Sequence, residues 1–425
     1  MNARRGMLAL SLFTGLMGAC QGGAPAAGPQ GSPVTQPPPA ASVTLPPAWT
    51  PTAGPTITPS ETAAVIPTAT LPATPSPLPR LTPAADTQGE AGHDHRIAFV
   101  SLRQGYKHIF TILEDGTRLI QLTADPVYDT LPTWSHDGEQ LAFLRAREED
   151  PRRLLQSDIY LVNPDGKGHQ DLTASLGRDI FSIVWSPDDR SIAFHAGMLG
   201  NDLAFPASNV YVVDPGTHAI RPVIQTSASN VGCSRPSWSP DQAYLVSACR
   251  GLMISGLVLK SLDGSLSYFA DLPGDGVFWM PSGETIVYTG GMAGLLSRVY
   301  PAYLISKGEP VSEWPAALDH SLEAIGYESM PVYSVIWSPT HDGRFILQSP
   351  NLMQIIDLDL NRITRVTADF AGVEGQASWS PDEARVVYAY NDGSDFELAI
   401  VDLTTGESRR LTDNDADDLM PAWRP

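Results

Sequence analysis

The stretch Trp379-Ser380-Pro381-Asp382 returns in altered form along most of the chain. In each copy an apolar run ends at the tryptophan, and a tight turn follows, because proline presets φ and aspartate can bond its own backbone. Successive tryptophans are 41 to 58 residues apart, a spacing typical of repeat architectures. The tryptophans that mark the copies are Trp134, Trp185, Trp238, Trp279, Trp337, Trp379 and Trp423.

Each copy also contains the pattern of four short strands. The first ends at the tryptophan, a second follows the turn at once, as in 385–390, a third is apolar, as in 158–162, and a fourth often closes in Leu-Thr, as at Leu411-Thr412. Four strands per period of about 40 to 50 residues indicate a propeller blade. We therefore expect an all-β fold, a seven-bladed β-propeller over residues 95–425. Six or eight blades remain alternatives because the copy at Trp279 is the least regular, and an open β-solenoid or two β-sandwiches is the other arrangement.

The two ends of the repeat region predict how the ring closes. The region starts with a second-type strand at 95–101, and it ends with a first-type strand at 418–423. The C-terminal strand should therefore complete the N-terminal blade. Such closure removes the unpaired sheet edges that an open array would expose.

The N-terminal residues predict an exported protein. Arg4 and Arg5 precede an apolar run over 7–17 and then Gly18-Ala19-Cys20, the pattern of a secretory signal. Because 16–20 resembles a bacterial lipobox, we expect residues 1–20 to be a lipoprotein signal peptide and Cys20 to be lipidated. A plain cleaved signal and an uncleaved anchor are the alternatives. Residues 21–94 are rich in Pro, Thr and Ala and predict a disordered stalk.

The net charge of the chain argues against two classes of ligand, and its cysteines predict a disulfide. The formal net charge is −20, with 47 acidic against 27 basic residues, which argues against nucleic-acid binding and against direct adhesion to anionic lipid. Cys233 lies just before the first strand of the Trp238 repeat and Cys249 ends its second strand, so the hairpin between these strands should make them neighbours. In an exported protein this favours a disulfide over two free thiols.

The repeats resemble those of the TolB-type propeller family, in which a Trp-Ser-Pro-Asp-Gly hairpin is followed by an apolar strand and an Ile-Tyr-apolar-apolar strand. The counterparts here are 134–138 and 159–162. The resemblance covers residues 95–425 and implies the fold, whereas the repeated residues belong to turns and packing and imply no particular function. Similar repeats build the propellers of prolyl-oligopeptidase-like peptidases and of some polysaccharide lyases. The chain departs from the family in lacking the preceding small α/β domain and in having a lipobox and a stalk.

The sequence contains no pattern that predicts catalysis. It has no Gly-x-Ser-x-Gly elbow, no His-x-x-x-His pair and no Cys-x-x-Cys. Asp413, Asp415 and Asp417 resemble the opening of a calcium loop, but Asp418 stands where glycine is needed and Arg424 where the bidentate glutamate is needed. A solvated loop is the favoured interpretation, so we predict no catalytic residue and no cofactor, with calcium as the alternative.

One set of carboxylates predicts a binding site. In a propeller the connections from fourth to first strands open around one channel mouth, and acidic residues recur about five positions before the tryptophans. We expect this mouth to select cationic or amine-bearing ligands, including a peptide segment, unless the acids only cap turns. We also expect the long loops at 147–157 and 198–208 on the opposite face. The mouth residues are Asp129, Asp179, Glu374 and Asp418.

These observations favour a monomeric, lipid-anchored, extracytoplasmic binding module, located at the cell surface or in the periplasm, whose partner is an envelope protein or peptide. The alternative from another class is a carbohydrate-active, lyase-like enzyme that uses carboxylates or a metal at the channel mouth. A passive surface-layer component is a third interpretation.

Overall fold

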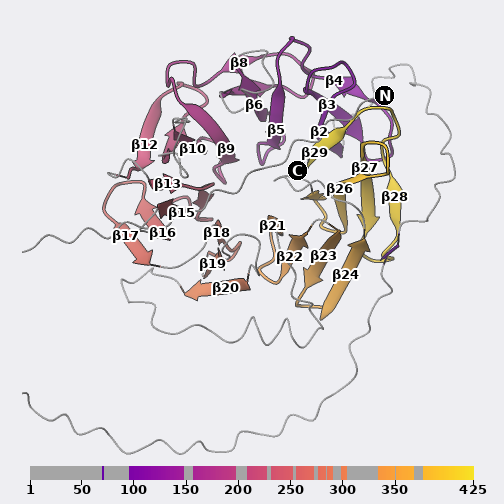
Figure 1. The fold of residues 1–425 in the computed structure, drawn as a ribbon. Coiled ribbons are helices and arrows are strands. Elements are labelled where there is room, and N and C mark those ends of the chain that lie inside the picture. The colour runs from indigo at the N-terminus through magenta and orange to yellow at the C-terminus, as the bar shows by residue number, and fades with distance from the viewer. Residues whose placement is uncertain are drawn as a thin grey trace, which may run out of the picture. The chain divides into compact units, whose positions relative to one another are not determined.

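The computed structural model describes residues 69–70, 95–147, 157–197, 208–226, 231–251, 255–271, 276–283, 285–290, 298–303, 334–349, 351–367 and 377–425. Its strands form six sheets and no helix occurs among these residues, so the all-β class is confirmed (Figure 1). The predicted signal peptide, and the predicted stalk apart from 69–70, lie outside the described residues.

Three sheets have the predicted four strands. One contains β5 (Asp129–Trp134), β6 (Leu141–Ala146), β7 (Ser157–Val162) and β8 (Gln170–Asp171). Another contains β25 (Ala377–Trp379), β26 (Arg385–Asn391), β27 (Phe396–Asp402) and β28 (Ser408–Arg410). The third contains β29 (Asp418–Trp423), β2 (Arg96–Ser101), β3 (His108–Leu113) and β4 (Ile120–Gln121). Because β29 pairs antiparallel with β2, the C-terminal strand completes the N-terminal sheet as predicted.

A nine-stranded sheet holds two repeats. The first comprises β9 (Asp179–Trp185), β10 (Ile192–Gly197), β11 (Ser208–Val213) and β12 (Ile220–Ile224). The second comprises β13 (Val231–Cys233), β14 (Ser237–Trp238), β15 (Tyr244–Gly251), β16 (Ser255–Ser261) and β17 (Ser267–Asp271). A parallel contact between Ser208 of β11 and Gly232 of β13 joins them.

The remaining strands belong to two further repeats. One sheet contains β18 (Gly276–Trp279), β19 (Thr285–Gly290) and β20 (Arg298–Tyr303). The other contains β21 (Ser334–Trp337), β22 (Arg344–Gln348), β23 (Leu352–Asp357) and β24 (Arg362–Thr367). A short strand from the predicted stalk, β1 (Ala69–Thr70), pairs parallel with β24.

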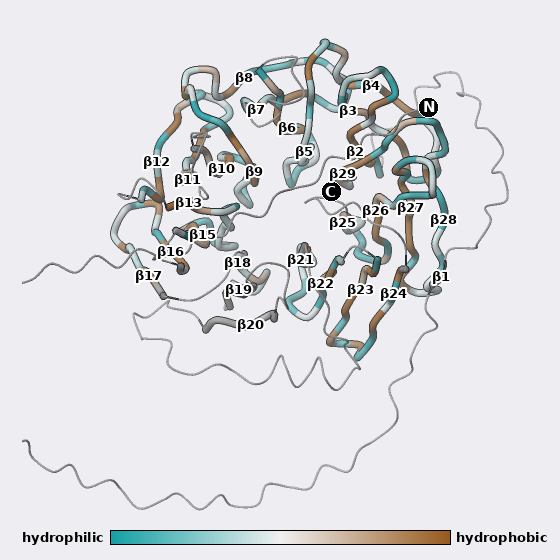
Figure 2. Tube along the Cα trace, viewed as in Figure 1, coloured by the Kyte–Doolittle hydropathy of each residue, from teal (hydrophilic) through white to brown (hydrophobic). Residues whose placement is uncertain are grey.

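The core lies between successive repeats. Apolar residues lie mostly along the strands, and among the described residues they form seven clusters, each of which joins one repeat to the next (Figure 2). Phe99 on β2 and Val387 on β26 belong to the cluster that joins the last repeat to the first, and both are fully buried. Burial of each such side chain contributes roughly 1.5–3 kcal/mol. The count of seven blades stays a prediction, because residues 304–333 lie outside the described part.

The Ser-Pro-Asp turn is built by side-chain hydrogen bonds. The Ser135 hydroxyl donates to Asp137 Oδ1 at 2.6 Å, and the amides of Glu139 and Gln140 donate to Asp137 Oδ1 and Ser135 Oγ. Partial burial works to raise the pKa of Asp137, but the bonds from Ser135 and Glu139 outweigh it and hold that pKa below its usual value. The turns at Ser186, Ser239 and Ser380 repeat this arrangement.

The tryptophans connect neighbouring repeats. The indole Nε1–H of Trp185 donates to the carbonyl oxygen of Thr133 at 3.2 Å, and Thr133 is the residue before Trp134 of the preceding repeat. An indole fits this place because it combines a large apolar body with one hydrogen-bond donor. The same bond, always to the residue before the preceding tryptophan, is made by Trp134 to Ala422, Trp238 to Val184 and Trp379 to Ile336.

A residue in some of these turns also bonds the preceding repeat. Asp189 has φ of 58°, and its carboxylate accepts hydrogen bonds from the backbone amides of His136 and Asp137 at 2.8 and 2.9 Å. Glu383 has φ of 51°, and its carboxylate accepts from the amide of Thr340 at 3.1 Å and contacts His341 Nδ1 at 2.8 Å. A non-glycine residue at positive φ is strained, and these contacts offset that strain.

The predicted disulfide is confirmed. Cys233 on β13 and Cys249 on β15 are direct cross-strand partners, they are bonded to each other, and both are buried. The bond therefore ties the first strand of this repeat to its second strand.

The first prediction tests the indole hydrogen bond. We expect Trp185→Phe to lower the free energy of unfolding by about 1 kcal/mol more than Trp279→Phe does. Both indoles are buried, but within the described residues the Nε1–H of Trp279 has no acceptor, so the second variant controls for lost ring volume. Guanidinium unfolding followed by tryptophan fluorescence measures both. Equal losses would contradict the role assigned to the bond.

The second prediction concerns the disulfide. The double variant Cys233→Ala/Cys249→Ala should lose about 3 kcal/mol of unfolding free energy, because a cross-link over 16 residues restricts the unfolded chain. Thermal unfolding with and without a reductant gives the readout: the reductant should lower the Tm of the natural chain and leave that of the variant unchanged. A reductant effect of the same size on both would show that it acts elsewhere.

Candidate functional site

Two kinds of connection meet at one end of the strands. Leu102, in the connection from β2 to β3, donates its amide to the carbonyl of Asp417, in the connection from β28 to β29, at 3.0 Å. Strands that alternate in direction bring second-to-third and fourth-to-first connections to the same end. We call this the mouth end, defined here by residues 102–107, 122–128 and 411–417.

The prediction that the long loops at 147–157 and 198–208 lie on the opposite face is wrong for Arg147, whereas 148–156 and 198–207 lie outside the described residues. Arg147 contacts the carbonyl of Arg178, and its guanidinium lies 3.7 Å from the carboxylate of Asp179. The reason is the antiparallel order of the strands, which the sequence argument did not apply to these loops.

Asp418 begins β29 at the mouth end and is fully buried. Arg103 Nη2 donates to its two carboxylate oxygens at 3.1 and 2.9 Å, and the guanidinium carbon of Arg103 lies 4.9 Å from the ring centre of Phe110. Burial raises the pKa of Asp418, although Arg103 acts in the opposite direction.

Asp129 begins β5 in the same manner. It is fully buried, and Arg145 donates to its carboxylate through Nε at 2.8 Å and Nη2 at 3.0 Å. The third nitrogen of Arg145, Nη1, donates to Asp125 Oδ2 at 2.6 Å. Burial raises the pKa of Asp129 against the effect of Arg145.

The predicted ring of open carboxylates is therefore not what these positions form. Asp129 and Asp418 are closed off from a ligand by burial and by their arginines, and Asp179 is largely buried beside Arg147. Glu374 lies outside the described residues. The sequence analysis did not single out the arginines that pair with these acids. Arg103, Arg145 and Arg147 all stand at or just after the end of a second strand, and this recurrence is the sequence signal that could have identified them.

A second polar position recurs beside these pairs. Near the start of the third strand the amides of Ile109, Ile159 and Leu398 each donate to the threonine of a Leu-Thr pair at 2.9 Å. The residues just before them are buried and titratable, which the sequence analysis did not single out. They are His108, Asp158 and Glu397.

Glu397 has a strongly raised pKa. It is fully buried on β27, and burial raises its pKa to about 7. Its Oε1 accepts the amide of Asn414 at 2.6 Å and lies 3.1 Å from Arg410 Nη2. A carboxylic acid with such a pKa changes its charge near neutral pH.

The predicted calcium ligands do not converge. Asp413 lies 3.0 Å from Arg410 and Asp417 accepts the amide of Phe396 at 3.1 Å, while Asp415 is exposed. Within the described ranges no three Asp, Glu, His or Cys side chains are grouped closely enough to hold a metal ion.

One serine–histidine pair has no accessible nucleophile. Ser182 Oγ and His195 Nδ1 are 2.5 Å apart, and burial lowers the pKa of His195 to about 4, so the imidazole is neutral at pH 7. However, Ser182 is 2% exposed. A nucleophile must meet its substrate, so this pair carries no catalytic assignment.

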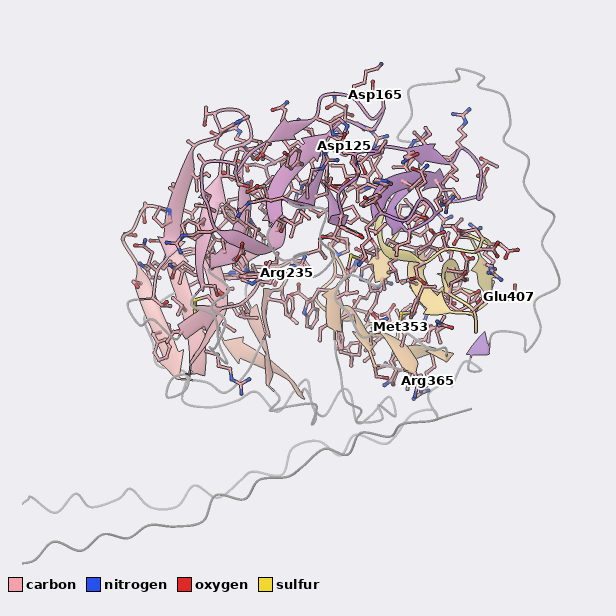
Figure 3. All side chains as sticks on the ribbon, turned by 45° about the horizontal axis from the view of Figure 1, so that its top comes forward. Asp125, Asp165, Arg235, Met353, Arg365 and Glu407 are labelled. Carbon is pink, nitrogen blue, oxygen red and sulfur yellow. A yellow bond between two sulfur atoms is a disulfide. The ribbon has the colours of Figure 1, made fainter. Side chains whose placement is uncertain are left out.

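The accessible surface of the mouth end combines aromatic and acidic groups. The rings of Tyr106 and Tyr128, both half-buried, lie 5.3 Å apart. The side chains of Asp125 and Asp413 are 66% and 56% exposed, and Asp125 is labelled in Figure 3. Such a surface can accept apolar contacts together with a positive charge.

Comparison with known proteins supports the fold. A protein TolB homolog from Chlorobium luteolum is 30% identical to this chain over 29% of the chain. The fold is that of a TolB-like propeller. The match spans only 35% of that relative's length, and no family model matches the chain.

Solved structures agree on the TolB-like fold. An oligogalacturonate lyase from Vibrio parahaemolyticus superimposes with a TM-score of 0.55 at 13% identity, covering 72% of this chain and 86% of its own. A functionally unknown protein from Desulfotomaculum acetoxidans gives 0.51 at 10% identity, covering 77% and 98%. At these identities the likeness concerns the fold alone. Within its described residues, the chain has no helix long and apolar enough to cross a membrane.

The third prediction tests the buried ion pairs. Arg145→Met should lower the free energy of unfolding by about 3–5 kcal/mol, because it leaves Asp129 buried without its cation. The double variant Asp129→Asn/Arg145→Met should recover much of that loss. Arg190→Met is the matched control, since Arg190 is 87% exposed and 3.9 Å from Asp188, and it should change little. A single variant no worse than this control would show that Asp129 is not held by Arg145.

Proposed function

We propose that this chain is a binding module of the cell envelope that takes a protein or peptide segment at the mouth end of its propeller. The observation that carries the proposal is the difference in exposure between two pairs of carboxylates. Asp129 and Asp418 are buried against arginines, whereas Asp125 and Asp413, which also pair with Arg145 and Arg410, keep 66% and 56% of their side chains exposed on the same connections. The exposed groups, beside the pair Tyr106 and Tyr128, supply the contact surface.

The chemistry of this surface fits an extended segment with basic or amine-bearing side chains. The net charge of −20 raises the local concentration of positive partners and speeds their encounter. Tyrosines at a contact surface give large area at low cost in side-chain entropy. The propeller would act as a monomer, without a cofactor.

The location belongs to the same proposal. The predicted lipobox with Cys20 and the proline-rich stretch would attach the propeller to a membrane and hold it away from the lipid, on the extracytoplasmic side. The disulfide between Cys233 and Cys249 supports an oxidising compartment.

The alternative of a polysaccharide lyase-like enzyme has support only from the fold. Two of the superimposed solved structures are described as oligogalacturonate lyases, one of them in complex with manganese, at 13% and 14% identity. Such an enzyme needs convergent ligands or carboxylates, and the described mouth-end acids do not converge on an open position.

The fourth prediction tests the binding surface. Asp415→Lys places a positive charge on the exposed mouth-end loop, and it should reduce the recovery of the partner about fivefold in affinity capture from native membranes, because one lost charge contact is worth about 1 kcal/mol. Glu407→Lys makes the same change of charge in the turn between β27 and β28, at the other end of the strands (labelled in Figure 3), and should leave recovery unchanged.

Mass spectrometry and metal analysis of the captured full-length protein decide between the two functions. One stoichiometric partner without metal supports the binding module. Equal losses for the two variants would contradict the mouth end as the contact surface. A retained divalent metal without a partner would overturn the proposal in favour of the enzyme.

A further inference from the structure

The seam of the propeller is the place where β29 leaves the last repeat to complete the first. The connection 411–417 crosses from β28 to β29 over the start of β27, and two buried carboxylates face it. Glu397 belongs to β27 of the last repeat, and Asp418 belongs to β29 of the first. Both are 0% exposed.

Asn414 bridges these two carboxylates. Its amide N–H donates to Glu397 Oε1 at 2.6 Å, and its side-chain Nδ2 lies 3.3 Å from Glu397 Oε2 and 2.8 Å from Asp418 Oδ2. A second tie holds the same connection, because the amide of Phe396 donates to Asp417 Oδ1 at 3.1 Å. The path of 411–417 therefore depends on the groups around Glu397.

Neither of the arginines near Glu397, Arg410 and Arg103, is available to Glu397 alone. From β28, Arg410 Nη2 lies 3.1 Å from Glu397, but also 2.7 Å from Asp392 and 3.0 Å from Asp413. Arg103, in the connection after β2, forms an ion pair with Asp418. The other groups that act on this cluster are Tyr390 on β26, Asp395 in the turn before β27, Asp417 in the connection itself and Lys107 beside Asp417.

We propose that Glu397 acts as a proton-operated latch on the seam, holding the connection 411–417 against β27 when it is neutral and loosening it when it is ionised. In the neutral state the buried acid carries no charge beside Asp418. In the ionised state two buried carboxylates face each other across Asn414, with Arg410 divided among three acids. Opening the connection lets water solvate the charge, so ionisation favours the open form.

The direction of the pH dependence follows from the linkage between proton binding and the stability of the closed form. The pKa of Glu397 is raised by burial to about 7, above its ordinary value of 4.5. The closed form therefore binds the proton more tightly than an opened form does, and its stability is fully present below pH 4.5 and is lost as the pH rises through about 7. Asp418, whose pKa is also raised by burial, acts in the same direction. The connection 411–417 is itself part of the mouth end, but exchange of the unbound chain tests the latch whether or not a partner binds there.

The fifth prediction is measured by hydrogen exchange of the full chain. Between pH 5 and pH 7 the protection factors of 411–417, corrected for the intrinsic pH dependence of exchange, should fall by up to about tenfold per pH unit. Glu397→Gln keeps the shape and the acceptor for Asn414 but cannot ionise, so its protection should stay nearly constant. Glu407→Gln, at the other end of the same sheet, should behave as the natural chain.

Two outcomes would overturn the latch. One is constant protection across this pH range in the natural chain, and the other is an equal fall in Glu397→Gln. If Glu397→Gln does not fold, Asn414→Ala supplies the second test: it removes the side-chain bridge but leaves the titrating acid, and it should lower protection at pH 5 while keeping the decline. Direct titration of the Glu397 carboxyl carbon by NMR should show a midpoint near neutral pH, and a midpoint near 4.5 would also overturn the proposal.

Discussion

The packing of each marker tryptophan in the apolar cluster that joins its repeat to the preceding one is the contact on which the other elements depend, and in four repeats an indole N–H hydrogen bond to the preceding repeat adds to it. It places Trp185 against Thr133, and with it the apolar cluster that separates the two sheets. Each sheet is covered on both faces by its neighbours, and the tryptophan packs into the cluster on the side of the preceding repeat. The turn after the tryptophan, the second strand and the end of the first strand all take their positions from this contact.

The fold was readable from the sequence because its signals are local and repeated. A tryptophan followed by Ser-Pro-Asp, as at Trp379, fixes a strand end and a turn whatever the rest of the chain does, and the order of strand types at the two termini predicts how β29 joins β2. The pairing of Cys233 with Cys249 followed from the same hairpin register. The blade at Trp279 stayed uncertain because its turn lacks the Ser and Asp that define the others.

The site was less readable, because burial is a property of the assembled sheets. Asp129 and Asp418 stand where a fourth-to-first connection enters a strand, a position that can be read from the sequence. It does not show that Arg145 and Arg103 meet them there, since each arginine belongs to another strand or connection. Glu397 was undervalued for a related reason: its isolation from water comes from 411–417, which returns over β27 only when the ring is closed.

The turns at Asp189 and Glu383 limit how far these repeats are interchangeable. In each, a residue in the left-handed region is sustained by donors that belong to the repeat before it, His136 and Asp137 in one case and Thr340 in the other. A repeat moved to a different place in the ring would keep its own strands and its own turn but would lose these donors, and its strained residue would be left uncompensated. The propeller is therefore periodic in its backbone and specific in its order, so a shuffled or duplicated arrangement of the same units would be a weaker protein than the natural one.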